Sequence, residues 1–108
     1  MKPVKRVEIV TGVQEFDQVV KVLGRFGITG YQVLHNVEGK GDRRVESVDA
    51  LTGEFRNRMI LTTCPPEVID ELVEALRPIL SRYGGVCVVF DAQCVIHSHH
   101  AADITGSR

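Results

Sequence analysis

The sequence has few aromatic residues and no long apolar run. Aromatic residues make up 6% of the 108 residues and tryptophan is absent, so a sheet of this chain has few rings on which RNA bases could stack. No stretch approaches the roughly 18 consecutive apolar residues of a membrane-spanning helix, and charged residues near the start interrupt any signal-peptide core. We therefore expect a soluble, unprocessed protein without a nucleic-acid partner.

Cysteine is scarce and the charges nearly cancel. The three cysteines, Cys64, Cys87 and Cys94, form no Cys-x-x-Cys pair, and their density is far below that of a disulfide-stapled secreted scaffold. We interpret them as small buried hydrophobic residues in a protein of the reducing cytoplasm. The chain has 13 Lys and Arg residues against 14 Asp and Glu residues, which leaves no basic field for phosphate backbones.

Familiar catalytic motifs are also missing. The chain has no Gly-x-Ser-x-Gly nucleophile elbow, no Walker-type phosphate loop and no His-Glu-x-x-His metal helix. Acyl-phosphate hydrolases of a similar topology use a Gly-rich cradle after the first strand, where this chain has only Thr11-Gly12-Val13. We expect a protein that is not an enzyme.

The apolar pattern predicts six elements in the order βαββαβ. Runs rich in β-branched residues predict strands over 4–11, 29–36, 58–63 and 86–97. Apolar residues at intervals of three and four predict helices over 13–26, with a stop at Gly27, and from Pro65 to Leu80. Pro78 should kink or divide the second helix. The last run is the most continuously apolar, as expected of a central strand.

This order is that of a ferredoxin-like α+β domain, an antiparallel sheet with both helices on one face. We place the domain at residues 1–97 and a flexible C-terminal tail at 98–108. The helices would leave one face bare, and the strands carry further apolar residues, among them Tyr31, Val33, Val88 and Phe90. Self-association around a symmetry axis is the simplest cover for such residues.

The segment from Val37 to Arg56 is long, charged and without apolar periodicity. In compact domains, connections beyond about 12–15 residues are usually functional or disordered. Here Gly39-Lys40-Gly41 precedes Asp42-Arg43-Arg44. Glycines let backbone N–H groups face an anion, and Lys and Arg are the usual grips on phosphate oxygens. A solvated loop of mixed charge fits the same residues.

The stretch Gly27-Ile-Thr-Gly-Tyr-Gln-Val-Leu34, followed by the long segment with its Gly-Lys-Gly-x-Arg sequence at 39–43, resembles the PII-like signalling proteins. The likeness runs from the first strand to His97 and is strongest with the branch associated with bicarbonate transport and carboxysomes. It implies a homotrimer with its sheets facing inward and nucleotide sites in the clefts between subunits. Residues of about 37–56 would be the T-loop, which reads ligands and docks a bicarbonate transporter or a carboxysome-related protein.

The resemblance also assigns residues of this chain to an adenine nucleotide. The base and ribose would meet Thr29, Thr62 and Thr63. The phosphates would meet Gly39, Lys40, Gly41 and Arg43. The neighbouring subunit would offer backbone N–H groups around Gly84, Gly85 and Val86.

Two departures from the family pattern favour ADP or AMP over ATP. Typical PII proteins carry a Thr-Gly-x-x-Gly-Asp-Gly-Lys loop after the second helix, where this chain has Tyr83-Gly-Gly-Val86. They also carry an Arg-x-Arg pair beyond the last strand, where this chain has His97-Ser-His-His100. Fewer cations suit a nucleotide with fewer phosphates. We expect no cofactor in addition to these ligands.

A second, small anion is expected beside the nucleotide. The loop and its base carry more cations than a mono- or diphosphate needs, and bicarbonate can accept the forked hydrogen bonds of a guanidinium. We assign bicarbonate to Lys40, Gly41, Arg56 and Arg58.

Two other functions fit the sequence. One is a trimeric metal-binding or metal-tolerance protein, in which copper or zinc would be held by His35 or by the group His97, His99 and His100. The other is a structural trimer that docks a partner through its loop without any small ligand.

Overall fold

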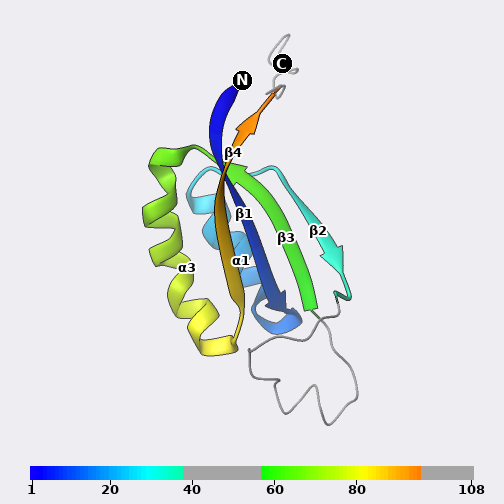
Figure 1. Ribbon diagram of the computed structural model, residues 1–108. Coiled ribbons are helices and arrows are strands. Elements are labelled where there is room, and N and C mark those ends of the chain that lie inside the picture. The colour runs from blue at the N-terminus through cyan, green and yellow to red at the C-terminus, as the bar shows by residue number, and fades with distance from the viewer. Residues whose placement is uncertain (38–56, 96–108) are drawn as a thin grey trace.

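The computed structural model describes residues 1–37 and 57–95. In chain order its elements are β1 (Lys2–Gly12), α1 (Val13–Arg25), β2 (Tyr31–His35), β3 (Asn57–Cys64), the 3-10 helix η1 (Pro66–Val68), α3 (Ile69–Tyr83) and β4 (Val86–Cys94). The strands form an antiparallel sheet in the order β2-β3-β1-β4, and α1 and α3 both cover one face of it (Figure 1). The predicted ferredoxin-like α+β fold is confirmed.

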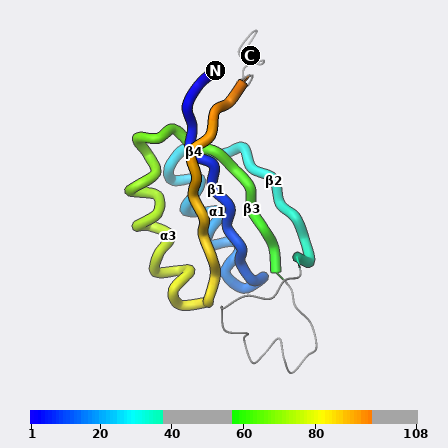
Figure 2. Tube along the Cα trace, in the orientation of Figure 1, coloured from blue at the N-terminus to red at the C-terminus, as the bar shows by residue number. Residues whose placement is uncertain are grey.

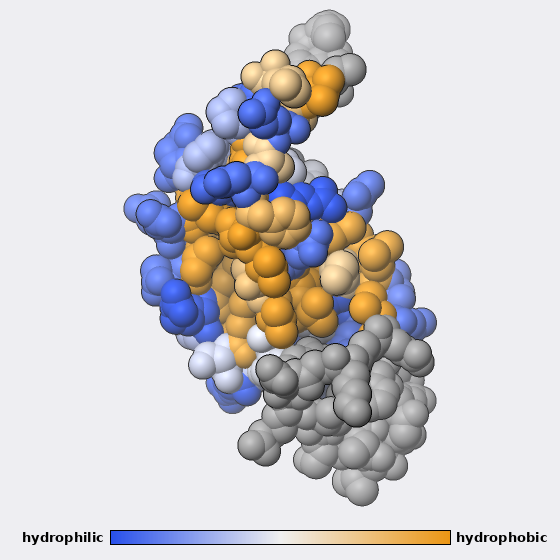
Figure 3. All heavy atoms as spheres, viewed as in Figure 1, coloured by the Kyte–Doolittle hydropathy of each residue, from blue (hydrophilic) through white to orange (hydrophobic). Residues whose placement is uncertain are grey.

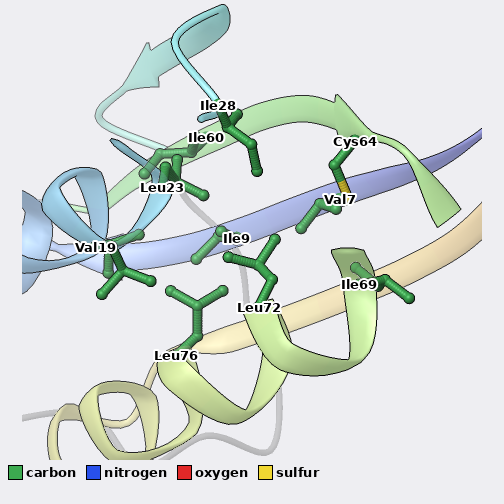
Figure 4. Close-up of a cluster of buried hydrophobic side chains, with 11 residues drawn as sticks. Val7, Ile9, Val19, Leu23, Ile28, Ile60, Cys64, Ile69, Leu72 and Leu76 are labelled. Carbon is green, nitrogen blue, oxygen red and sulfur yellow. The ribbon is translucent and has the colours of Figure 1, made fainter. Parts of the chain in front are cut away.

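The hydrophobic core lies between the sheet and the two helices. Ile9 of β1 and Ile60 of β3 are fully buried and directly opposite in the register, so their side chains share one face of the sheet. The helices add Val19, Leu23, Leu72 and Leu76 to this layer (Figure 4). Burying one such side chain contributes about 1.5–3 kcal/mol, and the layer therefore fixes which side of each strand faces the helices.

The first helix starts and stops at local signals. The Gly12 N–H donates to Glu15 Oε2 at 2.7 Å, which satisfies an amide at the helix start and places a carboxylate at the positive end of the dipole. At the other end α1 closes at Arg25, and Gly27 turns the chain with φ of 78°. The predicted stop at Gly27 is confirmed. A glycine suits this turn because it adopts the left-handed conformation without strain.

Pro78 does not divide the second helix. The helix α3 continues from Ile69 to Tyr83 with the proline inside it. Leu76 is buried and Leu80 packs against the core on either side of Pro78, so packing holds both halves of the helix in spite of one missing backbone hydrogen bond. The expected start at Pro65 is shifted, because residues 66–68 form the 3-10 turn instead.

The last strand lies at the edge of the sheet and is not the central strand that its apolar run predicts. Within the described sheet, β4 occupies one end of the strand order beside β1. Cys87 and Val89 pack against the core, whereas Val86, Val88 and Phe90 are 39%, 49% and 42% exposed. The run is apolar because one side meets the core and the other side belongs to the face that the helices leave uncovered.

That uncovered side of the sheet, called here the open face, is mostly apolar (Figure 3). The register gives it Val10, Leu34, Met59, Leu61, Val86, Val88 and Phe90.

The expectation that Tyr31 and Val33 belong to the uncovered face is wrong. Tyr31 pairs with the buried Thr62, and Val33 pairs with the buried Ile60, so Tyr31 and Val33 lie on the helix-facing side. Leu34, which is 49% exposed, is the apolar residue that β2 presents on the open face.

Replacing Gly85 with alanine should lower the free energy of unfolding by about 1–3 kcal/mol. An ideal Cβ at this position would lie 2.8 Å from the Val10 backbone oxygen and 2.6 Å from Leu80 Cδ2, so the Leu80 side chain would have to turn away and the main chain near Val10 would have to shift. Urea unfolding followed by circular dichroism measures the loss.

The matched control is Gly24→Ala in α1, where nothing lies within 4 Å of an added Cβ. Alanine is the better helix former by about 0.5–1 kcal/mol, so this variant should be slightly more stable than the wild type. Similar unfolding curves for the two variants would contradict the tight packing inferred at Gly85.

Candidate ligand site

Thr62 fastens the connection between α1 and β2 to the sheet. Its Oγ1 donates to the Gly30 carbonyl at 2.7 Å, and the residue is 4% exposed. The hydroxyl proton is thus used within the chain. Thr62 holds the turn that carries Thr29, and its predicted contact with a base or ribose stays a prediction.

The other two predicted base and ribose residues are exposed. Thr29 lies just before Gly30, the acceptor of the Thr62 hydroxyl. Thr63 pairs with Arg6 of β1 and lies on the open face, since neighbouring residues of a strand point to opposite sides. The three threonines therefore gather where β2 begins and β3 ends, at the β2 side of the sheet.

The predicted glycine donors lie at the other side of the sheet. Gly84 ends α3 in the left-handed conformation, with φ of 83°. The N–H groups of Gly84 and Gly85 both donate to the Leu80 carbonyl, at 2.8 and 3.0 Å. These amides close the helix, so a phosphate would have to share or displace that bond. Val86 follows on the open face, and the role of all three residues in binding stays a prediction.

The strand order separates these two groups of candidate residues. The threonines lie on and beside β2 and β3, whereas the glycines precede β4, and β2 and β4 are the two outer strands of the described sheet (Figure 2). One chain does not bring the groups together. Two copies placed edge to edge could, with the β2 side of one facing the β4 side of the other.

Arg58 is the member of the predicted bicarbonate set that lies within the described residues. Its guanidinium carbon stands 4.6 Å from the centroid of the Phe16 ring, a cation–π geometry that orients the charge. Thr11 and His35 flank it on the neighbouring strands. Thr62 lies four positions after Arg58, or about 13 Å along the strand at roughly 3.3 Å per residue, so the two lie toward opposite ends of β3.

Sequence reasoning missed a buried polar group near Arg58. Thr11, Glu15 and Asn57 are 0%, 3% and 8% exposed, and Thr11 Oγ1 has no hydrogen-bond partner in the described part of the chain. The Val37 N–H donates to the Asn57 carbonyl at 3.1 Å, so the group borders both ends of segment 38–56. The available signal was that Thr11 and Glu15 occupy positions where the apolar patterns of β1 and α1 call for hydrophobic residues.

Several predicted site residues lie outside the described residues. They are Gly39, Lys40, Gly41, Arg43 and Arg56 of the T-loop, together with His97, His99 and His100 of the tail. Their assignments, the loop boundaries at about 37–56 and the tail at 98–108 stay predictions.

The metal-binding alternative gains no support from the described residues. Across 1–37 and 57–95 there is no group of three or more His, Cys, Asp or Glu side chains that could hold a metal ion. His35 stands opposite Arg58, a positive neighbour that disfavours a cation. Within residues 1–37 and 57–95, every helix is too short or too polar to cross a membrane.

Burial makes two of the thiols poor nucleophiles. It raises the pKa of Cys64, with the Glu67 carboxylate adding to the effect, and it raises the pKa of Cys87. Both thiols stay protonated at neutral pH, whereas a thiolate is the form that attacks or binds metal. The interpretation of these two cysteines as small hydrophobic residues fits this environment.

The raised thiol pKa values predict that stability falls at alkaline pH. The folded chain holds these protons more tightly than the unfolded chain, so their contribution is complete below the unfolded pKa of about 8.5 and declines as pH rises through the folded pKa. Urea unfolding at a series of pH values from neutral to alkaline should show a smaller decline in the double variant Cys64→Ala/Cys87→Ala than in the wild type. Identical slopes in the two proteins would rule out the two buried thiols as the source of the decline.

The fold and these residues define a ferredoxin-like domain with candidate ligand residues at both sides of its sheet. The family model of the nitrogen regulatory protein P-II matches residues 4–99, and the chain belongs to this family. The resemblance noted from the glycine-rich stretches is thereby confirmed.

Solved structures of PII-like proteins match most of the chain. CPII from Thiomonas intermedia K12, bound to ADP, AMP and bicarbonate, is 27% identical, with 88% of this chain and 96% of that chain covered and a TM-score of 0.71. The same protein bound to ADP, AMP and acetate is 26% identical, with coverages of 88% and 91% and a TM-score of 0.75. A PII-like signaling protein from Thermus thermophilus is 26% identical, with coverages of 87% and 91% and a TM-score of 0.67. No curated protein matches the sequence.

Proposed function

We propose that the protein is a homotrimeric regulatory sensor of the cytoplasm that binds ADP or AMP in preference to ATP, and bicarbonate beside the nucleotide. The observation that carries this proposal is the likeness, over 88% of the chain, to CPII bound to ADP, AMP and bicarbonate. The sensor is not an enzyme. It signals through the T-loop in inorganic-carbon metabolism, by docking a bicarbonate transporter or a carboxysome-related protein.

The assembly is supported by two features of the single chain. The open face exposes Val88 at 49% and Phe90 at 42%, and soluble monomers rarely leave such a patch uncovered. The candidate nucleotide residues are divided between the β2 and β4 sides of the sheet. A ring of copies would account for both features. It would cover the open faces and bring the β2 side of one copy beside the β4 side of the next.

The preference for few phosphates is supported by the turn before β4. This turn, Tyr83-Gly84-Gly85, contains no lysine, and its glycine amides donate to Leu80. Arg82 beside it lies over the Tyr83 ring, 5.5 Å from the centroid, on the helical side of the chain. Cations for the phosphates must therefore come chiefly from Lys40 and Arg43 of the T-loop.

The two anions should bind cooperatively because they share residues. Lys40 and Gly41 are assigned both to the phosphates and to bicarbonate, so either ligand holds them in place for the other. Thermodynamic linkage then requires each ligand to raise the affinity of the other by the same factor.

The decisive experiment is calorimetric titration of the purified protein with AMP, ADP and ATP, in bicarbonate and in chloride at equal pH and ionic strength. We expect AMP or ADP to bind more tightly than ATP, and bicarbonate to strengthen that binding by about 5–150-fold, the usual range of coupling. The variant Lys40→Ala should lose the coupling, whereas Lys21→Ala, an exposed cation of α1, should keep it. Dissociation constants above about 1 mM for all three nucleotides would contradict the proposal. A constant of that size corresponds to a binding free energy of only about 4 kcal/mol.

A further inference from the structure

Two opposite charges stand on the central strand β1 of the mostly apolar open face, where Thr63 is a further polar neighbour of Arg6. Arg6 and Glu8 are two residues apart on β1 and so share a side of the sheet. Arg6 Nε lies 3.8 Å from Glu8 Oε2, and the two side chains are 34% and 32% exposed. The register sets Phe90 beside Arg6 and Val88 beside Glu8, with Leu61 on the other flank of Glu8.

In a single chain this ion pair contributes little. The separation is near the limit of a salt bridge, and a third of each side chain is in contact with water, which screens the attraction and solvates either charge alone. Loss of one partner would leave the other hydrated, and the fold of the single chain would hardly change.

When the open face is covered, the ion pair becomes important, because neither charge is then hydrated. Removal of water strengthens the attraction between the two charges but makes an unpaired charge very costly. A buried pair tolerates replacement of both partners by apolar residues far better than removal of one. The cost of a single substitution would therefore fall on the assembly and not on the single chain.

We propose that the Arg6–Glu8 pair is a specificity determinant of self-association, so that copies cover the open face when both charges or neither is present. This inference rests on the proposed homotrimer. The occupant is a second copy of the chain, because the pair sums to zero charge and the same face of another copy offers the opposite sign to each member. A similar surface that carried one sign of charge would be attracted by one member of the pair and repelled by the other, so it would gain no net attraction in exchange for the water removed from both charges.

The test is sedimentation velocity over a dilution series of the wild type, Arg6→Met, Glu8→Leu and the double variant. We expect each single substitution to raise the dissociation constant of the assembly about a hundredfold or more, and the double variant to return to within about tenfold of the wild type. Glu8→Gln, which keeps the shape of the side chain, serves if Glu8→Leu does not fold. Circular dichroism at the lowest concentration should show the same secondary structure in every protein.

A second ion pair provides the matched control. Arg77 Nη2 lies 2.9 Å from Glu74 Oε2 on α3, with side chains 64% and 68% exposed, so Glu74→Gln should leave the assembly unchanged. Single variants that assemble like the wild type, or a double variant as weak as the singles, would overturn the inference. A wild type that is monomeric at every concentration would overturn the homotrimer and the inference together. A wild-type trimer that binds no nucleotide would overturn the sensor function and leave this inference standing.

Discussion

Side chains along β1 alternate between the helix-facing side of the sheet and the open face. This strand pairs with β3 on one side and β4 on the other, so its alternate residues set the two faces for the whole sheet. Val7 and Ile9 point into the helical layer and are fully buried. Arg6 and Glu8 point away from it. A shift of the register by one residue would exchange these sets and bury two charges in the core.

Much of the fold could be predicted from the sequence, because its signals are local. Hydrophobic periodicity and glycine stops indicated the order of elements and the end of α1 near Gly27. The errors arose where tertiary packing decides. The apolar run of β4 looked central although the strand lies at an edge, and the helix continues through Pro78 because its flanking residues are packed. The sides of Tyr31 and Val33 depend on pairing with β3, which a single strand does not encode.

The candidate site was less accessible to such reasoning. The glycine and threonine positions were assigned by resemblance to a family. The chain's own pattern did not indicate that the Thr62 hydroxyl donates to the Gly30 carbonyl. Nor did it indicate that Gly84 and Gly85 close a helix. Buried polar residues such as Thr11 and Glu15 give a weak signal, since they appear as isolated breaks in an apolar pattern. Hydrogen-bond partners distant in sequence are set by the assembled fold.

If one nucleotide meets both the threonines and the Gly84–Gly85 turn, as proposed above, ligand binding depends on protein concentration. A site completed by two copies exists only in the associated state, so dilution would remove binding capacity without altering any residue. By mass action the converse also holds, and a nucleotide seated across the junction would hold neighbouring subunits together more firmly as its own concentration rises. The fraction of such a protein that is assembled would therefore rise with the concentration of its ligand.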